Sequence, residues 1–352
     1  MSNLLRYTVY RLLQAIPLLL GISIVAFALV EAMPGDPINI IVQGQEVDEE
    51  TLRILEERYG LDQPSWRRYL NFMGISHLLE TLGMSAFSDA PTGLLQGDLG
   101  TSLHHNQPVA DLMQTRLGPT LLLVLSAFAF ALVTAIPLGV LSAKRRNKPA
   151  DHISRVVALV GVSTPSFWIG IMLIILFAVQ LGWLPSGRLV LPWRSPSHYG
   201  YSGQIELYIQ TMRHLLLPMV ALGTLQMATI MRLERAEMVD SLQKEYVQLA
   251  RAYGISEGTI LRRHAFRPAQ LPIITIIGLN LSTALGGAVV TEQVFNINGM
   301  GRLVVQSIGQ LDYEVILGTT MGFAVLFVVG VIITDIAYAY IDPRISYGDR
   351  TR

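Results

Sequence analysis

Six uncharged stretches of the chain are each near or above the roughly 18–20 helical residues needed to cross the hydrocarbon core of a bilayer. They are residues 12–30, 117–143, 156–187, 214–231, 268–291 and 315–334. A helix satisfies its own backbone N–H and C=O groups inside lipid. A barrel would instead show short strands that alternate apolar and polar residues, and these stretches do not alternate. The sequence therefore predicts an all-α membrane protein with six transmembrane helices.

The composition favours the same class, because 51% of the 352 residues are hydrophobic and 15% are charged, a balance too apolar for an ordinary soluble protein. The chain has no cysteine, so neither a disulfide nor a thiolate metal site is available. Arg6 and Arg11 precede the first apolar stretch, as in a signal peptide. That stretch is long for a signal peptide and ends without a small-residue cleavage site. We expect an uncleaved membrane anchor.

The short connector 144–148 carries four basic residues, which the positive-inside rule places in the cytoplasm. Alternation along the chain then puts the N-terminus, residues 143–155, residues 232–267 and the C-terminal tail inside. Residues 31–116, 184–213 and 292–314 are predicted to lie outside.

The first outer segment carries a helical pattern from Asp48 to Tyr59, closed by Gly60, with Leu52, Leu55 and Tyr59 on one face. Prolines are expected to interrupt two spans further along, at Pro137 in the second and at Pro165 in the third. Gly318 and Gly322 would allow close helix approach in the sixth span, within the subunit or between subunits.

A polar segment, residues 240–272, separates two of the apolar stretches and is here called the polar connector. Seven ionised side chains lie between Lys244 and Arg267, so this connector faces water. Residues 240–252 are good helix formers, and Gly254 stands where a left-handed cap would end that helix. Ser256 is placed to cap a second helix with Glu257 in its first turn. Pro268 and Pro272 are expected in the first turn of the next span. A bent helical hairpin between two spans is suited to transmitting force.

Several blocks of the sequence resemble the inner-membrane permease subunits of ABC importers, specifically the dipeptide and oligopeptide permease branch. The blocks are Ala250-Arg251-Ala252-Tyr253-Gly254, Arg263-His264-Ala265, Leu271-Pro272, Leu61-Asp62-Gln63-Pro64 and Gly97-Asp98-Leu99-Gly100-Thr101-Ser102. Pro268-Ala269-Gln270 departs from the more usual Asn-Ala-Leu of that branch. Residues 73–96 form a longer insert than the branch usually has, and a surface loop is favoured there over a contact to an outer partner.

The resemblance implies that the polar connector docks on cytoplasmic ATPases. The residues expected to couple to them are Leu249, Ala250, Arg251, Ala252, Tyr253, Gly254, Arg263, His264, Leu271 and Pro272. It also implies an outer gate before the sixth span, with Glu292, Phe295, Gly299 and Gly301 lining the translocation path; a solvated loop is the simpler alternative. Glu31, Arg232, Glu292 and Asp335 fall at the ends of spans, where water can reach them.

The domain organisation that follows has four parts. They are the cytoplasmic N-terminus and first helix (1–31), an extracytoplasmic segment (32–116), the ABC-type permease domain (117–342) and a cytoplasmic tail (343–352). The expected partners are a second, similar permease subunit, two ABC ATPases, an extracytoplasmic solute-binding protein and the lipid bilayer of the cell inner membrane.

No catalytic or metal motif points to an enzyme. The sequence contains no G-x-x-x-x-G-K-[ST] loop, so this chain has no such means of hydrolysing ATP. ATP and Mg²⁺ would be bound by the partner ATPases, and no cofactor is expected in this chain. The histidines form no ligand pattern on one helix, and neither G-x-S-x-G nor H-E-x-x-H occurs. Two alternatives stay open: a self-sufficient secondary carrier or channel, and an ABC importer of a nickel chelate, glutathione or an oligosaccharide.

Overall fold

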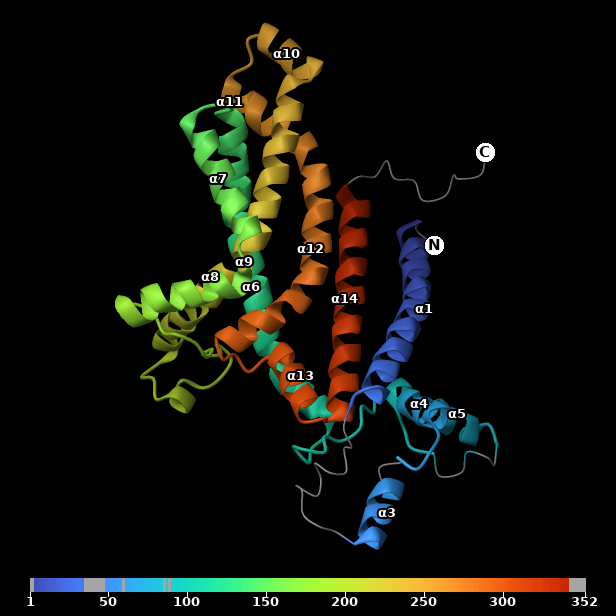
Figure 1. The fold of residues 1–352 in the computed structure, drawn as a ribbon. Helices are drawn as coiled ribbons and strands as arrows, with labels where there is room; N and C mark the ends of the chain where they lie inside the picture. The colour runs from blue at the N-terminus through green and yellow to red at the C-terminus, as the bar shows by residue number, and fades with distance from the viewer. Residues whose placement is uncertain (1–2, 35–47, 59–60, 85–86, 88–89, 342–352) are drawn as a thin grey trace. The chain divides into compact units, whose positions relative to one another are not determined.

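The computed structural model describes residues 3–34, 48–58, 61–84, 87 and 90–341 (Figure 1). Within these ranges the regular elements are helices, and no strand is formed. The predicted all-α class is therefore confirmed for the described part of the chain.

The long apolar helices follow the apolar stretches of the sequence. They are α1 (Asn3–Glu31), α6 (Val109–Lys144), α7 (Pro149–Ser163), α8 (Ser166–Leu173) with the π-helix η3 (Ile174–Gln180), α9 (Gln204–Gln243), α12 (Phe266–Val294) and α14 (Tyr313–Ile341). By length and composition, four helices among the described residues could cross a membrane, or five if the bent pair of α7 with α8–η3 is one span. The count of six stays a prediction, although α12 covers the expected stretch 268–291 as one helix.

The two expected proline breaks have different outcomes. Between α7 and α8 the helix axis bends by 105° at Thr164 and Pro165, because a residue before proline is driven to an extended backbone. That break is confirmed. The break at Pro137 is wrong, since α6 runs through both Pro119 and Pro137. Near Pro137 this helix lies close to α9, since a Cβ at Gly139 would stand 2.6 Å from Glu234 Cγ.

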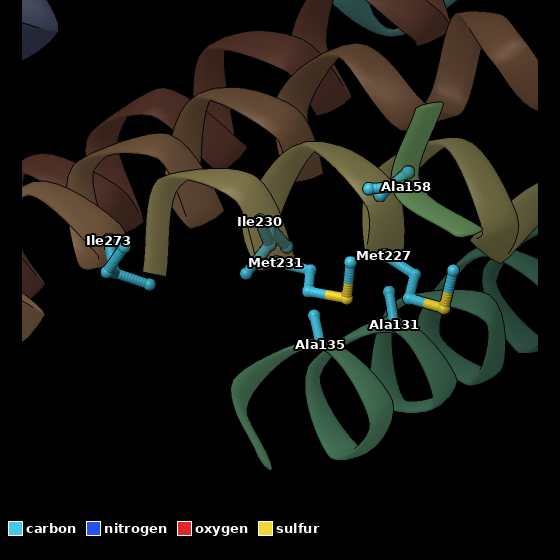
Figure 2. Close-up of a cluster of buried hydrophobic side chains, with 8 residues drawn as sticks. Ala131, Ala135, Ala158, Met227, Ile230, Met231 and Ile273 are labelled. Carbon is cyan, nitrogen blue, oxygen red and sulfur yellow. The ribbon is translucent and has the colours of Figure 1, made fainter. Parts of the chain in front are cut away.

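Contacts divide the chain into two compact units. The larger unit consists of residues 1–12, 119–298 and 326–352, and the smaller unit of residues 13–118 and 299–325. The core of the larger unit lies where α6, α7, α9 and α12 meet (Figure 2). Small side chains of α6 and α7, Ala131, Ala135 and Ala158, face Met227 and Met231 of α9 there. Alanines on two helices allow close approach, and the flexible methionines fill the space that remains.

The smaller unit contains four shorter elements of the outer segment. They are α3 (Glu49–Arg58), α4 (Ser65–Met73), α5 (Ile75–Thr81) and the 3₁₀-helix η2 (Leu94–Gln96). The helix predicted over 48–59 is confirmed as α3, while Gly60 and the face of Leu52, Leu55 and Tyr59 lie outside the described residues or side chains.

The insert 73–96 is not a plain surface loop, because it contains α5 and η2. The Gln96 side chain donates to the Gly74 carbonyl oxygen over 3.0 Å and accepts from the Gly93 N–H over 3.0 Å. These two bonds fold the insert back on the end of α4. The expectation of a loop was wrong because short helices held by such tertiary contacts have weak periodicity of their own.

The Gly318 and Gly322 pair packs inside the smaller unit. A Cβ at Gly318 would lie 2.7 Å from Val109 Cγ1, and one at Gly322 would contact Met113 Cε. The two glycines thus let α14 approach the start of α6 within one subunit. The short helix α13 (Met300–Gly309) belongs to the same unit, and its Leu303 shares an apolar cluster with Val109.

Candidate functional site: the polar connector

The first arm of the polar connector is α10 (Glu245–Ala252), which follows α9 after an extended residue at Lys244. In Figure 1, α10 lies at one end of the larger unit, and α11 lies beside the turn from α6 to α7. Gly254 has φ +73°, and its N–H donates to the Arg251 carbonyl oxygen over 2.9 Å. The Ile255 N–H closes the turn on the Ala250 carbonyl oxygen over 3.1 Å. The predicted left-handed glycine cap is confirmed, as this pair of bonds is typical of it.

The second arm differs from the prediction. Ser256 stands before α11 (Glu257–Thr259), but its hydroxyl bonds to the Thr259 hydroxyl over 3.0 Å and does not cap a backbone N–H. The helix then continues through the π-helix η5 (Ile260–Ala265) directly into α12.

Pro268 is the third residue of α12 and lies in its first turn, as expected, whereas Pro272 lies inside that helix. η5 runs into α12 without a break, so both prolines belong to a continuous helical run. The π-turn of η5 comes just before Pro268. A π-turn widens the helix and tolerates a carbonyl without its usual partner. This explains how the run passes the prolines without ending.

One face of the connector is anchored to the bundle. Val247, Ala250 and Ile260 are buried together against Leu242 at the end of α9. The buried Ser241 hydroxyl donates to the Ala265 carbonyl oxygen over 2.9 Å, which ties α9 to η5. The connector is therefore a folded element with a fixed attachment.

The opposite face of α10 is apolar and exposed. Leu249 is 58% exposed and Tyr253 is 78% exposed, and residues four apart lie on the same side of a helix. Tyr246, one turn earlier, is 43% exposed and its hydroxyl bonds to Ser241 over 3.0 Å. A rigid apolar face outside the core is what a protein partner can cover.

An ion pair links the two arms across the glycine turn. Arg251 Nε lies 2.8 Å from Glu257 Oε1. The hydrogen bond from Arg251 lowers the pKa of Glu257, and the same bond raises the pKa of Arg251. Both groups are therefore charged at neutral pH. Lys144, at the end of α6, also lowers the pKa of Glu257 through its charge, so the α6 end lies near this turn.

The other residues expected to couple lie further along the helical run. Arg263 is exposed and His264 is partly buried on η5, beside α10. Leu271 and Pro272 are partly buried on α12, about two turns beyond His264. The structure thus brings residues 249–254 together with η5, whereas Leu271 and Pro272 belong to the following span.

The predicted outer-gate residues divide between the two units. In the larger unit Glu292 and Phe295 are buried, and Thr120 Oγ1 donates to Glu292 Oε1 over 2.6 Å. The Phe295 carbonyl oxygen accepts the Arg188 N–H over 2.8 Å. Water access to Glu292 was predicted wrongly, because this residue belongs to α12 and is enclosed by packing. In the smaller unit Gly299 precedes α13 and Gly301 is buried in its first turn.

A set of buried polar residues was not anticipated. Glu234 on α9 is buried, and both of its carboxylate oxygens accept from Gln270 Nε2, over 2.9 and 3.0 Å. Asp151 on α7 is buried and bonded to Arg235. The sequence did hold one signal for Glu234, because it falls in a buried stripe of α9 with spacings of four and three residues: Met227, Met231, Glu234, Met238 and Ser241. Among the described residues, no group of three or more acidic or histidine side chains is placed to hold a metal ion.

Comparison with known proteins gives two family matches. Residues 135–347 match the binding-protein-dependent transport system inner membrane component, and residues 4–123 match the N-terminal region of such membrane components. The chain is 38% identical to an oligopeptide transport system permease protein of Bacillus subtilis, over 97% of this chain and 99% of that protein. It is 36% identical to a dipeptide transport system permease protein of Alkalihalophilus pseudofirmus, over 98% and 100%. It is 33% identical to a glutathione transport system permease protein of Escherichia coli, also over 98% and 100%.

Proposed function

This chain belongs to the family of inner membrane components of binding-protein-dependent transport systems, and we propose that it forms half of the translocation path of an ATP-driven importer of peptides. It is a permease subunit of an ABC importer, and its apolar helices make it a multi-pass membrane protein. The proposal extends to the solute, the partners and the orientation.

The observation that carries the mechanism is the exposed face of α10. Leu249 and Tyr253 project from an element whose other face is anchored by Val247 and Ile260. An ATPase that covers this face and moves on nucleotide binding would displace α10 as a rigid lever. Because the arms of the connector continue into α9 and α12, that displacement would tilt both helices and change access to the central path.

The proposed partners follow from the missing phosphate-binding loop and from the likeness of the chain to permease subunits. It has no phosphate-binding loop, so two separate ATPases would bind ATP and Mg²⁺ and this subunit would be non-catalytic. A second permease subunit would complete the path, and an extracytoplasmic binding protein would deliver the solute. The outer gate of Glu292, Phe295, Gly299 and Gly301 is part of this proposal.

The solute class rests on the relatives. The three proteins above are named for oligopeptides, dipeptides and glutathione, and glutathione is itself a tripeptide. A peptide is therefore the solute that these likenesses support.

The orientation rests on the basic connector 144–148. In this arrangement the N-terminus, the polar connector and the tail 343–352 are cytoplasmic, and segment 32–116 faces the outside. The permease domain would extend over 117–342.

The test is reconstitution of the complex, with its ATPases, second permease and binding protein, in liposomes with trialanine as solute. We expect trialanine to stimulate ATP hydrolysis and to accumulate inside. The affinity of the ATPase for the Leu249→Ser/Tyr253→Ser variant should fall by about a hundredfold or more, since two apolar anchors are worth several kcal/mol and each 1.4 kcal/mol is about tenfold. Gln248→Ser, an exposed change on the same helix, is the matched control and should bind normally.

Two results would contradict the proposal. One is ATPase binding by the Leu249→Ser/Tyr253→Ser variant at the wild-type level. The other is ion-gradient-driven uptake by this chain alone, which would mark a secondary carrier.

A further inference from the structure

Both oxygens of the buried Asp151 carboxylate accept two hydrogen bonds each. It is the third residue of α7, and its side chain is 0% exposed. One oxygen accepts from Ser142 Oγ over 2.6 Å and from Arg235 Nε over 2.6 Å. The other accepts from the Asn147 N–H over 2.9 Å and from Arg235 Nη2 over 2.9 Å. Two parallel N–H···O bonds from one guanidinium fix both the distance and the orientation of the pair.

These bonds join three elements. Ser142 lies near the end of α6, Asn147 lies in the turn to α7, and Arg235 lies on α9. Asn147 has φ +61°, a left-handed conformation that aims its N–H at the carboxylate. Asp151 and Arg235, here called the clamp, therefore attach the α6–α7 hairpin to α9.

The clamp sits where force from the polar connector would arrive. Arg235 is eight residues before the end of α9 at Gln243, about two turns from Lys244 and α10. The neighbouring residue Glu234 contacts α6, since a Cβ at Gly139 would lie 2.6 Å from Glu234 Cγ. At this level α9 is thus held to α6 by packing and to α7 by the ion pair.

We propose that the clamp makes α6, α7 and α9 move as one body when α10 is displaced, so that Asp151 and Arg235 are positioning residues for coupling. The inference rests on the proposed function and adds how displacement of the connector reaches the bundle. Without the clamp, α9 would slide along α7 over their small-residue contact, and ATP would be hydrolysed with less solute moved.

The first test is the trialanine transported per ATP hydrolysed by the reconstituted complex. Asp151→Asn keeps the shape and an acceptor oxygen but removes the charge that Arg235 binds. We expect this ratio to fall about tenfold, within the usual range of coupling between sites. Glu31→Gln makes the same chemical change in the ion pair with Arg68 of the smaller unit, and it should leave the ratio unchanged.

A second variant separates coupling from stability. Asp151→Asn/Arg235→Gln removes both charges of the clamp and leaves only the half-exposed Arg155, whose Nε lies 3.7 Å from Asp151 Oδ1, so the double variant should fold more stably than Asp151→Asn alone. The double variant should still transport about tenfold less trialanine per ATP hydrolysed than the wild type. A ratio that recovers together with the melting temperature would mean that the pair only stabilises the fold, and would overturn the proposal.

The decisive test replaces the clamp by a covalent bond between the same helices. The Cβ position of Gly161 on α7 lies 3.0 Å from the Ala228 Cβ on α9, slightly below the roughly 3.5–4.5 Å of disulfides. Since the chain has no cysteine, Gly161→Cys/Ala228→Cys would give a single disulfide. In the protein that retains Asp151 and Arg235, we expect the oxidised disulfide to leave transport intact. In the Asp151→Asn background, we expect the disulfide to restore the trialanine transported per ATP hydrolysed, and its reduction should lower that ratio again.

The outcomes distinguish the two proposals. If the wild-type complex shows no trialanine-stimulated hydrolysis, the proposed function fails and the clamp fails with it. If the wild type and Asp151→Asn transport the same amount of trialanine per ATP hydrolysed, the proposed function stands and only the proposal for the clamp is wrong. Loss of transport on oxidation of the otherwise unchanged protein would show that α7 and α9 move separately, and would also overturn the clamp.

Discussion

Gly254 and Gly139 are glycines for different physical reasons. At Gly139 a Cβ would collide with Glu234, so the residue serves close packing of α6 on α9. At Gly254 a Cβ would have nothing within 4 Å, and glycine is favoured only because the backbone has φ +73°. The sequence predicted the conformation of Gly254 from its place after a helix-forming run, whereas the role of Gly139 depends on a neighbour 95 positions away and had no local signal.

Replacing Gly254 by valine should uncouple transport. A left-handed backbone costs a residue with a side chain about 1–2 kcal/mol, and a β-branched one more, so the turn between α10 and α11 should distort. The measurement is solute-stimulated ATP hydrolysis in the reconstituted complex, which should fall while basal hydrolysis by the ATPases remains.

The matched control is Gly258→Val, four residues away. Gly258 also has open space around its Cβ position but lies in α11 without a positive φ. Equal stimulation in the Gly254→Val and wild-type complexes would contradict the role given to this turn.

At the scale of elements, the sequence predicted those whose signals are local. The helix α3, the first arm α10 and the break at Pro165 each follow from helix formers, a glycine or a proline within a few residues. The continuous α6, the π-turn η5 and the small helix α5 were missed, because no helix former, glycine or proline signal within a few residues marks them. The clamp was missed for the same reason, since Asp151 and Arg235 are 84 residues apart.

The approach of α14 to α6 gives an element-scale prediction. In Gly318→Val the new side chain would overlap Val109, whose Cγ1 lies 2.7 Å from where the added Cβ would stand. Overpacking of this kind costs about 1–3 kcal/mol, so the melting temperature of the purified protein in detergent should fall.

Two companion variants isolate the cause. Gly309→Val on α13 has open space at its Cβ position and should have little effect. Adding Val109→Ala to Gly318→Val should recover part of the loss. If the melting temperature is unchanged in Gly318→Val, the close packing of α14 on α6 is wrong.

For the whole molecule, segregation of apolar residues was enough to predict an all-α membrane protein. It was not enough to fix the number of spans, since the 105° bend after α7 leaves the third stretch either one broken span or two shorter elements. The exposed part of the candidate site could be predicted, because Leu249 and Tyr253 lie in a polar segment whose helix and turn signals are only a few residues apart in the sequence. Its buried attachment needed the three-dimensional arrangement.

Orientation is testable because the chain has no cysteine. In Leu249→Cys, a membrane-impermeant maleimide should label the protein in inverted vesicles from which the ATPases have been stripped, and leave it unlabelled in intact spheroplasts. Ser197→Cys, in the segment predicted to be outside, should behave in the opposite way. Labelling of the Leu249→Cys protein in intact spheroplasts would place the polar connector outside, where no cytoplasmic ATPase could reach it.

The open surroundings of Gly254 have one more consequence. Within this chain the turn selects the hand of the residue and not the presence of a Cβ, because no atom lies within 4 Å of where a Cβ would stand. A mirror-image alanine, placed there by semisynthesis, would find its preferred backbone already in place and would stiffen the turn instead of straining it. The same side chain in its natural hand would oppose the fold.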